Sequence, residues 1–261
     1  MAGPTTAERQ QSAPGRSRPP RRLKLPRPRT LIALAVALVL LGSGGVWVLY
    51  GSQWLRLEHV STSGTRVLTP EQVREAADAP VGAPLISVDS DAIEARLRRK
   101  LPRIDSIDVV RSWPHGIGLK VTERKPVLLI EKGGKFVEVD AKGVRFATVG
   151  RAPKGVPLLE LTTDQAAGSP SLRRFGTDRL LRASVQVAGD LPEAVAQRTR
   201  AVKVRSYDSI SLELSGERTV VWGSGEKGRA KAATLTALMK AAPKARHFDV
   251  SVPTAPASST S

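Results

Sequence analysis

The sequence predicts an α+β protein that consists of a disordered basic N-terminal tail, a single transmembrane helix, a βααββ module, and a mostly antiparallel β domain with helices on one face. Three observations lead to this prediction. One twenty-residue segment has no charged side chain, two helix patterns between strand patterns follow it, and alternating strands fill much of the remaining chain. Strands and helices in separate runs are typical of the α+β class.

The uncharged segment runs from Leu31 to Tyr50. At about 1.5 Å per residue, a helix of this length spans about 30 Å, which is the thickness of bilayer hydrocarbon. Trp47 and Tyr50 lie at its C-terminal end, where aromatic rings favour the headgroup layer. The alternatives are a buried core helix and a cleaved signal peptide, whose apolar region is shorter, about 7–15 residues. We expect an uncleaved transmembrane helix over residues 30–50.

Residues 1–29 contain six prolines and eight basic residues against one acid, Glu8. Such a segment buries too little apolar surface to fold, so we expect a disordered tail. Positive charge next to a membrane helix favours the cytoplasmic side. The charge pattern therefore predicts a single-pass protein with a cytoplasmic N-terminus and with residues 51–261 on the extracytoplasmic side.

The net charge of the chain is +17, and it has no cysteine. The part beyond the membrane remains basic without the tail, and its core must hold it together without disulfides. Outside the cell, the anions that a basic surface meets are lipid headgroups and wall polymers. We therefore expect contact with the lipid bilayer, non-specific contact with anionic wall polymers, and no nucleic acid partner.

Residues 54–124 predict the βααββ module. Thr69, Pro70 and Gln72 have the spacing of a helix start with a capping box. A second helix is expected over residues 89–101, with Ile93 and Leu97 on its buried side. Two alternating strands follow, separated by a turn at residues 114–116.

Residues 125–253 predict the second domain, and residues 254–261 a disordered tail. Gly133 and Gly134 separate two strands of a hairpin, and residues 163–171 have the composition of a surface loop. Helices are expected at 177–188 and 230–242, and strands at 127–131, 135–140, 144–149, 201–205, 209–214, 219–222 and 247–252.

The motifs for catalysis are weak. Residues 223–228 form a G-x-G-x-x-G sequence between a strand and a helix, but this sequence comes late in a chain with antiparallel patterns, so a flexible turn is the better interpretation. The three histidines do not have zinc-ligand spacing. Glu123, Glu131, Glu138 and Asp140 offer carboxylates for glycan cleavage, although acids that alternate along strands are usually solvated. We therefore predict no enzyme activity and no cofactor.

Several motifs resemble those of the FtsQ/DivIB family of bacterial cell-division proteins, whose βααββ module is called a POTRA domain. The most specific are V-V-R-S-W-P at residues 109–114 and V-T-E-R-K-P at residues 121–126. Weaker matches are residues 84–89, 101–104, 140–146 and 156–158. The resemblance implies a non-enzymatic scaffold of the division machinery in the cell membrane at the septum.

The predicted interaction element is the last strand, Arg246 to Val252. If this strand lies at the sheet edge, its unpaired backbone groups can pair with a partner's strand, and Phe248, Val250 and Val252 share one face. The resemblance implies that the partners are the single-span FtsB/DivIC and FtsL types. Pro253 shortens the strand, and a tryptophan of the family beyond it is missing here.

Two alternatives to this function stay open at the level of sequence. One is a membrane-anchored, wall-active enzyme, which requires a carboxylate pair in a cleft. The other is the POTRA module of a transport or secretion system, for which repeated modules are expected. The sequence contains one such module.

Overall fold

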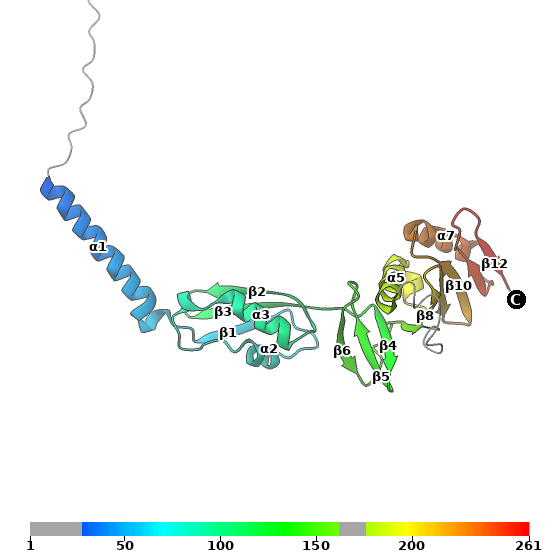
Figure 1. Ribbon diagram of the computed structural model, residues 1–261, viewed down its shortest axis with the longest axis horizontal. Helices are drawn as coiled ribbons and strands as arrows, with labels where there is room; N and C mark the ends of the chain where they lie inside the picture. Colours follow the sequence, from blue (N-terminus) through cyan, green and yellow to red (C-terminus); the bar gives the residue numbers. More distant parts are fainter. Residues whose placement is uncertain (1–27, 162–175, 261) are drawn as a thin grey trace, which may run out of the picture. The chain divides into compact units, whose positions relative to one another are not determined.

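The computed structural model describes residues 28–161 and 176–260 (Figure 1). The chain divides into two compact units, Met1–Gly51 and Ser52–Ser261. In the first unit, α1 (Pro28–Gly51) is one helix of 24 residues without a buried side chain, and it is long and apolar enough to cross a membrane. It begins two residues before the predicted boundary, because proline is favoured in the first turn of a helix. The rest of the predicted tail, residues 1–27, lies outside the described residues.

The second unit begins with the βααββ module. Its elements are the 3-10 helix η1 (Gln53–Leu55), β1 (His59–Ser63), α2 (Pro70–Ala77), the 3-10 helix η2 (Leu85–Ser87), α3 (Ser90–Lys100), β2 (Ile104–Ser112) and β3 (Gly116–Glu123). The sheet order is β1-β3-β2. The central strand β3 runs parallel to β1 and antiparallel to β2. The module predicted for residues 54–124 is therefore present with the expected order of elements.

Local chemistry explains where the two helices of the module begin. The Thr69 hydroxyl accepts the Gln72 amide, and the Gln72 side chain accepts the Thr69 amide, which forms the predicted capping box. The Asp89 carboxylate accepts the Ala92 amide at the start of α3. Side chains from both helices and from β2 and β3 form one core, and Val60 of β1 packs against it. The core includes Val73, Ala77, Ile93, Leu97, Ile107, Ile117 and Leu119.

The second domain contains one nine-stranded sheet. Its strands are β4 (Leu128–Lys132), β5 (Lys135–Val139), β6 (Arg145–Val149), β7 (Leu158–Leu161), β8 (Thr199–Ser206), β9 (Ser209–Leu214), β10 (Arg218–Gly223), β11 (His247–Asp249) and β12 (Ala257–Ser259). Their order is β12-β11-β10-β9-β8-β7-β4-β5-β6. The helices are α5 (Thr177–Asp190), α6 (Glu193–Ala196) and α7 (Gly228–Ala241). Five of the eight neighbouring strand pairs are antiparallel.

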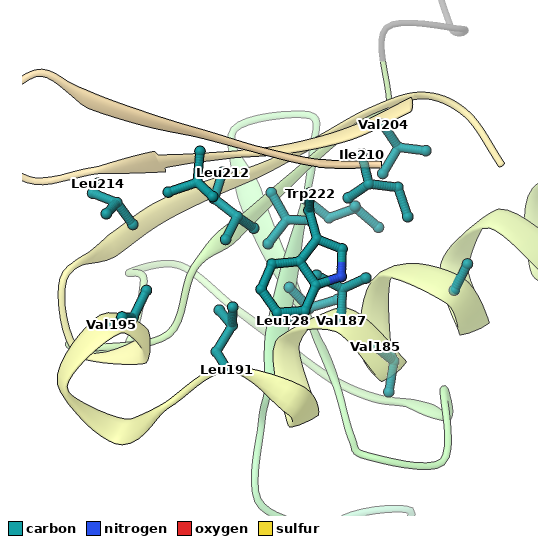
Figure 2. Packing of buried hydrophobic residues seen from close by; sticks show 14 of the residues in the cluster. Leu128, Val185, Val187, Leu191, Val195, Val204, Ile210, Leu212, Leu214 and Trp222 are labelled. Atoms are coloured by element: carbon teal, nitrogen blue, oxygen red, sulfur yellow. The ribbon is translucent and has the colours of Figure 1, made fainter. Parts of the chain in front are cut away.

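The core of this domain surrounds Trp222 of β10, whose side chain is fully buried. Figure 2 shows its indole ring between the strands and Val187 and Leu191. Leu235 of α7 belongs to the same cluster, so α5 and α7 cover the same face of the sheet. This arrangement agrees with the prediction of helices on one face.

Three points of the sequence prediction need correction, and a fourth lies outside the described residues. The tail predicted to be disordered from residue 254 contains β12, which pairs with β11. The closing strand ends at Asp249 rather than Val252. Strand β7 was not predicted, and it joins β4 and β8 by parallel pairing. The loop expected at 163–171 lies outside the described residues.

Candidate partner-binding site at the C-terminal edge

The predicted interaction strand is not the edge of the sheet. β11 pairs on one side with β10, where Val220 is opposite Phe248, and on the other with β12, where Phe248 is opposite Ser258. The side chains of Phe248 and Val250 are only 2% and 0% exposed, because they lie on the face that the helices cover. Val252, at 54%, is exposed. The expectation that residues 246–252 form a free edge with an accessible face is therefore wrong.

The edge is instead β12, drawn in red beside the C-terminus in Figure 1. The chain passes Pro253 and Pro256 and then returns antiparallel to β11. The Arg246 amide donates to the Ser259 carbonyl at 2.9 Å, which holds the returning strand in place. All three side chains of β12 are small and exposed. Among the described strands, none pairs with its outer side, so β12 is an edge of the described sheet.

A hollow of about 410 Å³ lies beside this edge. It is lined by the end of α7 and the residues that follow it, Ala242, Pro243, Lys244 and Ala245, and by Ser258, Ser259 and Thr260. Because Ser258 is opposite Phe248, the hollow lies next to the helix-covered face of the sheet. A strand added to β12 would place alternate side chains over it.

The sequence reasoning missed β12 because Ala-Ser-Ser has neither the alternation nor the β-branched residues of a typical strand. Pro253 also predicts the end of the closing strand, with a tail of small residues after it. Prolines also occur in turns, and a turn at this point brings the chain back beside β11.

Three of the four carboxylates considered for glycan cleavage, Glu123, Glu138 and Asp140, have structural partners, whereas Glu131 is exposed in β4. One oxygen of Glu123 accepts the backbone N–H groups of Arg66, Val67 and Leu68 at 2.7, 3.1 and 3.0 Å. Glu138, which is buried, pairs with Arg103 at 2.6 Å. Glu123 therefore orders the loop before α2, and it belongs to the E-R-K-P segment that the sequence analysis singled out.

Asp140 is also buried and fully engaged. Its carboxylate pairs with Arg124 and accepts the amides of Lys142 and Val144, both at 2.8 Å. Arg124 also contacts Asp105 of β2 at 3.1 Å and donates to the Pro102 carbonyl at 3.0 Å. These contacts join the last residues of the βααββ module to the hairpin of the second domain.

Replacing Glu123 by alanine should lower the free energy of unfolding by about 2–3 kcal/mol, because hydrogen bonds to a charged acceptor contribute about 1.5–3 kcal/mol. Urea denaturation would measure this loss, and amide hydrogen exchange at residues 66–68 should become faster. Glu123→Gln keeps one acceptor oxygen and should lose less. Equal stability of the alanine variant and the parent would contradict the loop-ordering role.

The pKa of Asp140 predicts a dependence of stability on pH. Burial alone would raise this pKa, but the Val144 amide, Arg124 and the Lys142 amide outweigh burial, so the pKa lies below the ordinary value of 3.8. The stabilisation is thus complete above pH 3.8 and is lost as the pH falls through the lowered pKa. In Asp140→Asn, the free energy of unfolding measured with urea should therefore fall less steeply as the pH is lowered. An equally steep decline in the variant would contradict the assignment.

The G-x-G-x-x-G segment forms a turn packed against α5. Gly223 has φ 78°, and a Cβ at Gly228 would lie 1.9 Å from Oδ2 of Asp190. Gln186 donates to the Gly225 carbonyl at 3.1 Å, and buried Lys231 donates to the Ser224 carbonyl at 2.8 Å. Burial lowers the pKa of Lys231. Backbone conformation and close packing therefore explain why glycines occupy these positions, which agrees with the prediction of a flexible turn.

Within residues 28–161 and 176–260, no group of three or more histidine, aspartate or glutamate side chains is placed to hold a metal ion. His59, His115 and His247 lie at the start of β1, in the β2–β3 turn and in β11.

An apolar helix of membrane-spanning length, a βααββ module and a mixed β domain together define a class of membrane-anchored proteins with a single POTRA module. Residues 55–124 match the family model described as "POTRA domain, FtsQ-type". Two relatives named cell division protein FtsQ, from Streptomyces collinus and Streptomyces coelicolor, are each 69% identical over 264 residues, covering 100% of both chains. The chain belongs to the FtsQ family of cell division proteins.

A solved structure is more distantly similar. It is the major extracytoplasmic domain of the cell division protein DivIB from Geobacillus stearothermophilus. It aligns with a TM-score of 0.33 and 14% identity, covering 46% of this chain and 94% of that chain. A similarity this low adds nothing to the description of the fold.

Proposed function

We propose that the protein is a non-catalytic scaffold of the division machinery at the septum. Membership of the FtsQ family supports a role in division, and α1 fits a single-pass membrane protein. The eight basic residues within residues 1–29 favour a cytoplasmic N-terminus, with the POTRA module and the β domain on the outer side. There the basic surface also makes non-specific contact with anionic wall polymers.

The scaffold binds its partners through the outer edge of β12. The observation that carries this proposal is an edge strand whose outward backbone groups face no other described strand. A strand from a single-span partner of the FtsB/DivIC type, in complex with an FtsL-type protein, adds to this edge. Each new backbone hydrogen bond contributes about 0.5–1.5 kcal/mol net, so a few aligned pairs give measurable affinity.

The hollow beside β12 supplies the side-chain part of recognition. Ala242, Pro243 and Ala245 give it apolar walls, and Lys244 brings a positive charge. A partner strand with apolar residues at alternate positions and an acid near Lys244 fits this chemistry. Val252 adds apolar surface near the end of β11, whereas Phe248 and Val250 act from the core by holding β11 in place.

The test is a chain that ends at Pro256 and so lacks β12. Deleting residues 246–253 would be uninformative, since it removes buried Phe248 and Val250 and disrupts the core. The exposed strand β12 contributes no buried side chain and only pairs with β11, so the shortened protein should stay folded with a small decrease in melting temperature. Its affinity for a reconstituted FtsB/DivIC-type and FtsL-type complex should fall by about tenfold or more, which corresponds to about 1.4 kcal/mol.

Ser258→Ala is the matched control for this truncation. It removes a hydroxyl but keeps every backbone group of the edge, so binding through main-chain pairing should be unchanged. Full affinity of the shortened chain would contradict the proposed site. Loss of affinity in Ser258→Ala equal to that of the truncation would show recognition by the hydroxyl instead of the backbone.

A further inference from the structure

Three segments of the POTRA module meet at one end of its sheet. The Leu57 amide donates to the Ala83 carbonyl at 2.9 Å, and the Gly82 amide donates to the Leu57 carbonyl at 2.8 Å. The Glu58 amide donates to the His115 carbonyl at 2.7 Å. The chain arriving from α1, the α2–α3 connection and the β2–β3 turn are therefore held together. We call this the proximal end.

The proximal end presents three large apolar side chains to solvent. Trp54 is 68% exposed, Val81 67% and Trp113 49%. Each comes from a different one of the three segments, and Val81 lines one hollow together with Gln53 and Arg56. An indole buries much apolar area and carries a polar N–H, a combination that suits the boundary between lipid and water.

If α1 spans a bilayer, the short connection between α1 and Trp54 keeps the proximal end close to that bilayer. Trp54 follows the last residue of α1, Gly51, by three residues. Three residues extend at most about 11 Å, and each headgroup layer is about 5–8 Å thick. If α1 spans the bilayer, Trp54 must lie within the headgroup layer or directly above it.

We propose that the proximal end, through Trp54, Val81 and Trp113, docks on the lipid surface that α1 crosses. The charged and titratable groups nearby include both signs, Arg56, Glu58, His59 and His115, so the contact is primarily apolar and interfacial rather than a response to anionic lipid. This inference rests on the membrane anchor of the proposed function but not on partner binding at β12.

Docking at three points limits how the POTRA module can tilt, whereas a single chain connection leaves it free to rotate. The register of β1 and β3 places His59 opposite Gly116, so both strands leave the proximal end in the same direction. β3 has eight residues and carries the chain about 26 Å before it reaches the second domain. If the tilt of the POTRA module is fixed, the distance from the lipid surface to the start of the second domain is fixed as well.

The test uses the absence of cysteine from the chain. Val81→Cys is labelled with a nitroxide in the full-length protein, which is reconstituted into vesicles of phosphatidylethanolamine and phosphatidylglycerol. Val67→Cys is the matched control, since Val67 is 64% exposed and lies beside Glu123 at the opposite end of β3. Power saturation should show a severalfold higher ratio of oxygen to nickel-chelate collisions at position 81 than at position 67.

A second variant tests the two indoles. Trp54→Ser combined with Trp113→Ser, in the Val81→Cys background, should lower the ratio at position 81 to that of position 67, with an unchanged circular dichroism spectrum. Equal, water-like ratios at both positions in the parent would overturn the proposal. A ratio at position 81 that rises only when another membrane protein is co-reconstituted would also overturn it, because the occupant would then be a protein rather than lipid.

Discussion

Replacing Phe248 by alanine should lower the free energy of unfolding of the second domain by about 3–5 kcal/mol, the usual cost of removing a buried aromatic ring. Phe248 is 2% exposed and belongs to the cluster around Trp222. A typical domain has a total stability of about 5–15 kcal/mol, so this loss is a large share. Urea denaturation followed by tryptophan fluorescence would measure it.

Val252→Ala is the matched control for Phe248→Ala. Val252 follows the same strand but is 54% exposed, so its truncation should change stability by less than about 0.5 kcal/mol. If Phe248→Ala instead kept full stability and lost only partner binding, Phe248 would be a surface contact, as the sequence alone suggested, and the burial described above would be contradicted.

Replacing Arg124 by methionine should lower the free energy of unfolding by about 3 kcal/mol. Arg124 pairs with buried Asp140 and contacts Asp105. Removing one partner of a buried ion pair leaves the other charge uncompensated, which costs about 3–5 kcal/mol. The two amides that Asp140 also accepts place the expected loss at the lower end of this range. Thermal or urea unfolding of the full chain would measure the loss.

A double-mutant cycle provides the control for Arg124. Asp140→Asn removes the charge that Arg124 compensates, so Arg124→Met should cost less in the Asp140→Asn background than in the parent. The expected coupling lies within the range of about 0.5–3 kcal/mol found for residues in contact. Additive losses would contradict the importance of this ion pair.

The sequence predicted the elements whose chemistry is local. The capping box at Thr69 and Gln72 defines the start of α2 without help from the rest of the fold. β9 (Ser209–Leu214) matches its predicted range, because apolar residues alternate along it and turns bound it. The same holds for the hairpin between β4 and β5, where Gly133 and Gly134 both have positive φ.

The parts that the sequence did not predict depend on contacts between distant residues. β7 is a four-residue strand that exists because β4 and β8 lie on either side of it. β12 has no apolar side chain and becomes a strand only through pairing with β11. This pairing decides which strand is the edge, so the strand predicted to be the edge lies one strand inside the edge of the described sheet. The ion pairs of Arg103 and Arg124 join residues 16 or more positions apart, which no local pattern indicates.

If β12 is the partner-binding edge, a partner must lie closer to β12 than to the opposite edge of the same sheet. Among the described strands the sheet has two edges, β12 and β6. A photoactivatable cross-linker attached to Ser258→Cys on β12 or to Thr148→Cys on β6 would report which edge lies beside an FtsB/DivIC-type partner in reconstituted membranes. We expect cross-links from position 258 and none from position 148. Cross-links from position 148 alone, or from neither position under conditions in which the complex forms, would show that β12 is not the partner-binding edge.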